Sequence, residues 1–125
     1  MEKRVIETRK APSPKGKYSQ MVQGGPYVFV SGQLPFTPEG ELVKNDIEAQ
    51  AKQVLENIRA MLEEAGSSMA KVVKVGVYLS DIGDFQVMNS VYSTYFAEDP
   101  PARTTLVVGS FPPGIRIEVD VIALT

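Results

Sequence analysis

Residues 115–123 read Ile-Arg-Ile-Glu-Val-Asp-Val-Ile-Ala. Apolar and polar side chains alternate through this stretch, a pattern that predicts a β-strand with one buried face. The apolar set comprises Ile115, Ile117, Val119, Val121 and Ala123. Because successive side chains of a strand point to opposite faces, Arg116, Glu118 and Asp120 share the other face. The stretch therefore predicts a rigid strand with the Glu118 carboxylate near its middle.

A second strand-like run precedes this one and begins with Arg103. Alternation along it places Thr105 and Val107 on the same side as the Arg103 guanidinium. Pro112-Pro113-Gly114 separates the two runs, and periodicity by itself predicts a hairpin through this break. An arginine and a glutamate are thus both expected on strands rather than on loops.

The rest of the chain mixes strand and helix patterns. Strands are predicted at residues 3–8, 18–22, 27–31 and 71–79, and helices at residues 46–65 and from residue 81 or 83 to 96. In the 71–79 strand, Val73, Val75, Val77 and Leu79 are expected on one face. Strand-helix-strand units with right-handed crossovers place both helices on one face of a sheet. The prediction is a single α+β domain spanning residues 1–125, with the other sheet face open to water or to another chain.

Composition restricts the chemistry. The 125 residues are 43% hydrophobic, enough for one core, and include neither cysteine nor histidine. Disulfides, cysteine or histidine zinc sites, thiolate nucleophiles and Ser-His pairs are therefore excluded. Carboxylate, lysine, tyrosine or water is left to transfer protons.

Charge and hydropathy also restrict the partners. The net charge is -2 and the sequence pI is near 5.2, which disfavours nucleic acid as a ligand. No apolar run approaches the roughly 20 residues that a membrane helix needs. The expectation is a cytoplasmic protein that binds neither nucleic acid nor membrane.

Arg103 and Glu118 are the first candidates for a site. The planar guanidinium of Arg103 can hold a carboxylate through two hydrogen bonds, although a structural Arg-Glu pair remains an alternative. Without histidine, a carboxylate such as Glu118 can accept a proton near neutral pH without a large pKa shift. An exposed strand glutamate is the plainer interpretation of Glu118, and Asp120 competes for the same role.

Further polar candidates have equally plain alternatives. Gly32 would let a ligand approach the backbone closely, whereas Ser31 before it fits a turn serine as well as a binding residue. Ser31 is a poor nucleophile because Lys74 is its only apparent base. Tyr18 could donate a hydrogen bond to a ligand or serve as an interface tyrosine. For Asn89, the plain alternative to a binding role is a hydrogen bond to nearby backbone.

Four ordered motifs cover nearly the whole chain. They are Tyr18-Ser19-Gln20, Val30-Ser31-Gly32-Gln33-Leu34-Pro35, Met88-Asn89-Ser90-Val91-Tyr92 followed by Phe96, and Pro101-Ala102-Arg103-Thr104-Thr105 with Ile117-Glu118-Val119. In this order and spacing the chain resembles the RidA/YjgF family of imine deaminases.

The resemblance implies a fold and an assembly. The fold would be chorismate-mutase-like, with the last strand inserted centrally and separated from the Arg103 strand by the 71–79 strand. The assembly would be a homotrimer with one site in each cleft between subunits. An open sheet face carrying Glu118 beside Ile122 and Leu124 suits burial by a partner.

The resemblance also assigns roles to residues. Arg103 and Glu118 would be catalytic, and the substrate-binding set would comprise Arg103, Tyr18, Ser31, Gly32, Asn89 and Thr105, with no metal and no cofactor. Thr105 stands where many members have cysteine. Any activity must therefore be independent of a thiol at that position.

The activity implied is hydrolytic deamination of short 2-imino or 2-enamino acids, such as 2-aminoacrylate, to 2-oxo acids and ammonia. These reactive compounds are products of pyridoxal-phosphate dehydratases. One alternative is a non-catalytic trimer that binds 2-oxo acids or other small carboxylates. A second is the ribonuclease or translation-inhibitor activity attributed to some members, which the acidic pI disfavours.

Overall fold

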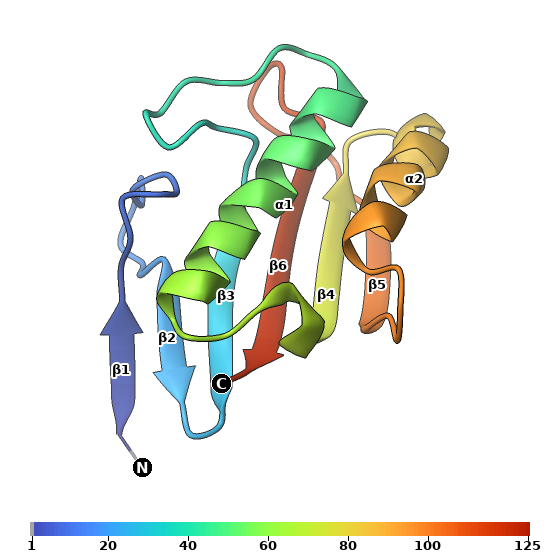
Figure 1. Cartoon of the computed structure of the whole chain (residues 1–125). Helices are drawn as coiled ribbons and strands as arrows, with labels where there is room; N and C mark the ends of the chain where they lie inside the picture. Colours follow the sequence, from blue (N-terminus) through green and yellow to red (C-terminus); the bar gives the residue numbers. More distant parts are fainter. Residues whose placement is uncertain (1) are drawn as a thin grey trace.

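A computed structural model describes residues 2–125, which form a six-stranded mixed sheet and two α-helices (Figure 1). The strands are β1 (Lys3–Ile6), β2 (Met21–Gly24), β3 (Tyr27–Gln33), β4 (Val72–Leu79), β5 (Ala102–Val107) and β6 (Ile117–Leu124). The α-helices are α1 (Ile47–Glu64) and α2 (Phe85–Tyr95), and the 3-10 helices η1 (Met69–Lys71) and η2 (Ile82–Asp84) come before β4 and α2.

The last strand lies inside the sheet. The strand order is β1-β2-β3-β6-β4-β5, with β6 antiparallel to both neighbours and β5 parallel to β4. The hairpin predicted from periodicity is therefore wrong, and the central insertion implied by the family resemblance is confirmed. At the centre, both hydrogen-bonding edges of β6 are paired, and its apolar face is covered.

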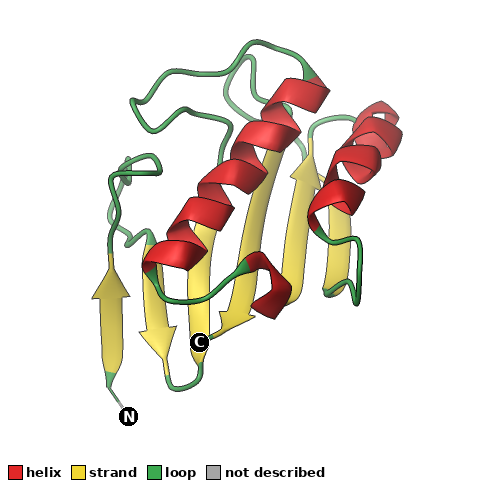
Figure 2. Cartoon of the chain, viewed as in Figure 1, coloured by secondary structure: helices red, strands yellow, loops and turns green. Residues whose placement is uncertain are grey.

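Both α-helices pack on one face of the sheet, as Figure 2 shows. Ile117, Val119, Val121 and Ala123 of β6 are buried in the core beneath them, as the alternation predicted. The apolar stripe of α1 meets this layer, and Gly66, with φ of +78°, follows the end of that helix in a conformation that favours glycine.

Two strand predictions need correction. The strand predicted at residues 18–22 begins only at Met21, so Tyr18 lies in a loop. Val73 was expected on the buried face of β4 but is exposed, because a register shift between Val72 and Lys74 interrupts the alternation. The remaining predicted positions Val75, Val77 and Leu79 are fully buried.

The opposite sheet face has no covering element within residues 2–125 (Figure 1). Register places Tyr27 beside Leu124 and Phe29 beside Ile122 on this open face. Tyr27, Phe29 and Leu124 are 42%, 46% and 40% exposed. An apolar patch of this kind is typical of a surface that another chain covers. Within residues 2–125, no helix is both long and apolar enough to cross a membrane.

Candidate functional site

Glu118 lies on the open face of β6, against Gly32 of β3. A Cβ atom built on Gly32 would lie 3.0 Å from Cδ of Glu118 and would clash with its Oε2. The β3–β6 register shifts between Val30 and Gln33, so Ser31 and Gly32 occupy an irregular part of the ladder. Such irregularities redirect side chains beside functional sites. The absence of a side chain at Gly32 is what makes room for the Glu118 carboxylate.

Four of the predicted site residues line one cleft of about 400 Å³: Tyr18, Ser31, Gly32 and Glu118. The rest of its lining is Pro12, Ser13, Pro14, Lys15, Gln20, Gln33, Leu34 and Phe36. This volume falls in the range of small-molecule sites, and the lining is mostly apolar with a few polar groups. We name this the Glu118 cleft.

Hydrogen bonds within the chain define what Tyr18 and Ser31 can offer a ligand. The Lys15 N–H donates to the Tyr18 hydroxyl at 3.2 Å, so the Tyr18 hydrogen is free to point into the cleft. Ser31 Oγ donates to the Ser19 carbonyl at 2.6 Å. The Ser31 hydroxyl is thereby committed as a donor, which suits an acceptor or spacer role better than that of a nucleophile.

Gln20 fixes the loop that forms one wall of the cleft. Its side chain accepts from the Thr8 N–H at 2.8 Å, and its amide nitrogen donates to the Pro12 carbonyl at 2.8 Å. Gln20 is almost fully buried, so these bonds satisfy polar groups that water does not reach. The Tyr18-Ser19-Gln20 motif contained this residue, but its anchoring role required contacts that a sequence pattern does not reveal.

The environment of Glu118 favours its protonated form. Burial, and secondarily the negative charge of Asp120, raise the pKa of the Glu118 carboxyl above its usual range. Asp120 itself accepts a hydrogen bond from the Tyr78 hydroxyl at 3.2 Å, in a space left open by Gly76. A carboxylate with a raised pKa is a stronger base than an ordinary glutamate.

Arg103 lies in a second hollow, between β5 and α2. Its Nη1 donates to Asn89 Oδ1 at 2.8 Å, and its guanidinium carbon lies 4.6 Å from the Tyr92 ring centre. Phe85 flanks it at 5.7 Å. Pro100, Pro101 and Phe96 help to line this Arg103 hollow. The Asn89 bond uses one guanidinium nitrogen, and the remaining donors can bind an anion.

The two halves of the predicted site lie on opposite faces of the sheet. Arg103 aligns with Val75 and Thr105 with Val77 in the parallel β4–β5 pair, and both valines face the helix-covered core. Glu118 aligns with Tyr78 on the open face. Within one chain the structure therefore brings Arg103 together with Asn89, with Thr105 on the same side of β5, but does not bring them to Glu118.

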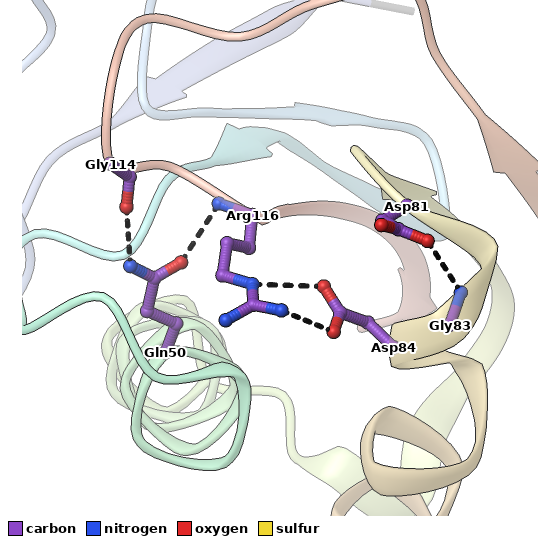
Figure 3. Close-up of polar contacts among 6 residues, drawn as sticks. All are labelled: Gln50, Asp81, Gly83, Asp84, Gly114 and Arg116. Atoms are coloured by element: carbon purple, nitrogen blue, oxygen red, sulfur yellow. Dashed lines mark hydrogen bonds and ion pairs between the residues drawn. The ribbon is translucent and has the colours of Figure 1, made fainter.

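A partly buried polar network holds the segment before β6 against the N-terminal ends of both helices (Figure 3). Arg116, just before β6, donates to Asp84 through Nε at 3.0 Å and Nη2 at 2.6 Å. Gln50 of α1 accepts from the Arg116 N–H at 2.9 Å and donates to the Gly114 carbonyl at 2.7 Å. Asp84 immediately precedes α2, which carries Asn89. The network fixes the start of β6 relative to both helices.

Sequence reasoning missed four residues of the two sites. Tyr92 and Phe85 flank the Arg103 guanidinium, and Lys15 and Phe36 line the Glu118 cleft. Tyr92 belonged to a quoted motif, and its spacing indicated only a core residue. Its ring is buried against Arg103, and burial raises the pKa of its hydroxyl while the Arg103 charge opposes the rise. Lys15 and Phe36 stand in loops, where periodicity carries no information about what faces a cleft.

Comparison with known proteins gives consistent results. A family model described as Endoribonuclease L-PSP matches residues 8–125. A RutC family protein of Pyrococcus abyssi is 54% identical over 124 residues, covering 98% of each chain.

Two further relatives have more informative descriptions. Reactive Intermediate Deaminase A, a chloroplastic protein of Arabidopsis thaliana, is 39% identical over 98% of this chain and 66% of its own. The crystal structure of E. coli TdcF with bound serine superimposes with a TM-score of 0.92 at 36% identity, covering 98% of both chains.

Proposed function

Because this chain belongs to the endoribonuclease L-PSP family, the RidA/YjgF family that its motifs resemble, we propose that it hydrolyses short 2-imino acids to 2-oxo acids and ammonia. The family includes reactive intermediate deaminases. A 2-imino acid presents a carboxylate next to an electrophilic C=N carbon. The chain offers a carboxylate-binding arginine and a basic carboxylate for these two groups.

The proposed reaction needs one water and one base. Glu118 accepts a proton from the water as its oxygen bonds to the imine carbon, and the nitrogen takes up a proton from solvent. Glu118 then returns its proton to the nitrogen of the resulting aminoalcohol as the C–N bond breaks. Ammonia is released, and loss of the hydroxyl proton to solvent leaves the C=O of the 2-oxo acid. Imines hydrolyse without a catalyst, so positioning the substrate and one water provides useful acceleration.

The carboxylate of the substrate is assigned to Arg103 of a neighbouring copy. The observation that carries this assignment is the placement of Arg103 and Glu118 on opposite faces of one sheet. A second copy covering the open face would bury Tyr27, Phe29 and Leu124 and could bring its Arg103 hollow to the Glu118 cleft. We propose a cyclic homotrimer, the assembly that the family resemblance implies, in which one such heterologous contact is repeated three times around a closed ring.

Subunit mixing tests this arrangement. Arg103→Met and Glu118→Gln are each expected to release little ammonia from 2-aminoacrylate generated by a serine dehydratase. Equal amounts unfolded and refolded together should recover about a quarter of the parental activity, because random assembly pairs two intact half-sites in about one interface in four. Refolding each variant alone is the control. No recovery, despite mixed oligomers, would contradict a site shared between copies.

The same preparations separate catalysis from binding. The description of TdcF with bound serine favours small amino-acid-like carboxylates as ligands in this fold, which also suits a non-catalytic binding protein. If the parent binds 2-oxobutyrate but leaves the spontaneous rate of ammonia release unchanged, the binding role replaces the deaminase proposal.

A further inference from the structure

Lys15 contributes a cation to the Glu118 cleft that the proposed reaction does not use. Of the cleft-lining residues in the described chain, Lys15 alone is cationic and Glu118 alone is anionic. The Lys15 Nζ lies 3.4 Å from the centre of the Phe36 ring. A ring face attracts the ammonium group but accepts no ordinary hydrogen bond from it.

Apart from the Phe36 ring, the charge of Lys15 has no partner among residues 2–125. Within residues 2–125, its Nζ forms neither an ion pair nor a hydrogen bond, whereas Lys52 pairs with Glu48 and Arg116 with Asp84. An ammonium group has three donors and no acceptor. Those donors are available to an anion in the cleft.

The backbone that carries the Phe36 ring is held in place. The Phe36 carbonyl accepts a hydrogen bond from Nδ2 of Asn57, a buried residue of α1, at 2.8 Å. The Phe36 N–H donates to the Leu34 carbonyl at 2.8 Å, and Phe36 also bridges to Leu42.

The backbone of Lys15 is held as well. Its N–H donates to the Tyr18 hydroxyl, and the Tyr18 N–H donates to the Gly16 carbonyl at 3.0 Å. The lysine stem thus leaves a short turn anchored beside a predicted ligand-binding residue. This anchored turn places Lys15 in the lining of the cleft.

We propose that Lys15 selects for a second carboxylate, so that the cleft takes dicarboxylic 2-imino acids such as 2-iminoglutarate. This inference rests on the proposed function. Arg103 of the neighbouring copy holds the carboxylate that every substrate shares, and Lys15 holds the one at the end of the side chain. Pro12, Pro14, Leu34 and Phe36 provide apolar surface for the methylene groups between them. The reaction is unchanged: water adds at C2, the C–N bond breaks, and 2-oxoglutarate and ammonia are released.

Calorimetric titration with two product acids tests the proposal. The parent should bind 2-oxoglutarate more tightly than 2-oxobutyrate. Lys15→Met keeps the length of the stem and removes the charge, so it should weaken 2-oxoglutarate binding by roughly tenfold and 2-oxobutyrate binding by less than twofold. Lys17→Met is the matched control, because Lys17 is exposed on the same loop and does not line the cleft. It should change either affinity by less than twofold.

The outcomes distinguish this proposal from the one on which it rests. If the parent binds 2-oxobutyrate and not 2-oxoglutarate, selection by Lys15 is wrong and the proposed function stands. Equal losses of 2-oxoglutarate affinity in Lys15→Met and Lys17→Met would show a general effect of charge. That result would also overturn selection of the second carboxylate by Lys15. An equal loss of both acids in Lys15→Met would assign the lysine a structural role. If neither acid binds, selection by Lys15 is overturned, whereas the proposed function is decided by ammonia release from 2-aminoacrylate.

Discussion

The Glu118 cleft and the Arg103 hollow are built in different ways. In the cleft, the backbone makes the space: Gly32 and the irregular β3–β6 ladder leave room for the Glu118 carboxylate. In the hollow, side chains hold the guanidinium through the Asn89 amide and the Tyr92 ring. The carboxylate position therefore depends on main-chain geometry, whereas the arginine position depends on packing against one helix.

This difference predicts how each half responds to substitution. A side chain added at Gly32 must displace the Glu118 carboxylate. Substitutions around Arg103 are expected to change the orientation of its guanidinium by smaller amounts. Because the halves lie on opposite faces of the sheet, a defect in one should not disturb the other within a single chain. Each of the following experiments tests that separation.

Glu118→Gln should have the largest effect. It preserves the shape of the side chain but removes the base, so ammonia release should fall by roughly 100-fold or more. Binding of 2-oxobutyrate should change much less, since the base acts mainly in the transition state. Stopped assays of ammonia and titration of the acid measure the two effects. Asp120→Asn is the control; a larger loss there would identify Asp120 as the base.

Gly32→Ala should reduce ammonia release by roughly 30-fold, because the added Cβ displaces the Glu118 carboxylate. The matched control is Gly24→Ala in β2, where a Cβ would meet only the Phe29 ring at 3.6 Å. Steady-state rates and circular dichroism compare the two variants. Equal activity in both would mean that the position of Glu118 is not set by the glycine.

Asp84→Asn tests the polar network that holds the segment before β6 against both helices. Asp84 is buried and accepts two bonds from Arg116, so losing its charge should lower the free energy of unfolding by about 2 kcal/mol. Urea unfolding gives the value, and Asp81→Asn, at an exposed site, provides a control with a smaller effect. If Asp84→Asn lowered the free energy of unfolding by less than Asp81→Asn does, the Arg116–Asp84 ion pair would contribute nothing to stability.

Arg103→Lys should weaken 2-oxobutyrate binding by roughly tenfold, because lysine keeps the charge and loses the paired donors of the guanidinium. Titration of the acid measures this loss. Unfolding in urea should be much less affected than in Asp84→Asn. Unchanged affinity would make Arg103 a structural residue.

The pH dependence of the rate should show the smallest effect. Burial first, and Asp120 second, raise the pKa of Glu118, so ammonia release should fall as pH drops through a value above the usual glutamate range. Asp120→Asn removes the negative charge that is the second cause, so the fall in rate should move to lower pH. The pKa of Glu118 should stay above the usual glutamate range, because burial still raises it. A shift to higher pH, or none, in rate profiles of the two proteins would contradict the influence of Asp120.

Much of this fold could be predicted because its signals are local. The alternation in residues 115–123 predicted which side chains of β6 are buried, and the spacing in α1 predicted its buried stripe. Val73 was predicted on the wrong face because the register shift that exposes it depends on pairing with β6. The order of β4, β5 and β6 came from the family resemblance, since alternation is the same in a hairpin and in a central strand.

The sequence by itself determined the types of group available: a guanidinium and carboxylates on strands, and neither thiol nor imidazole. Only the tertiary structure decided that Arg103 faces the helices while Glu118 faces the open side of the sheet. The physical reason is that alternation assigns a side chain to one of two faces of its own strand. Which face lies beneath the helices, and which strand lies alongside, depends on contacts between residues far apart in the chain.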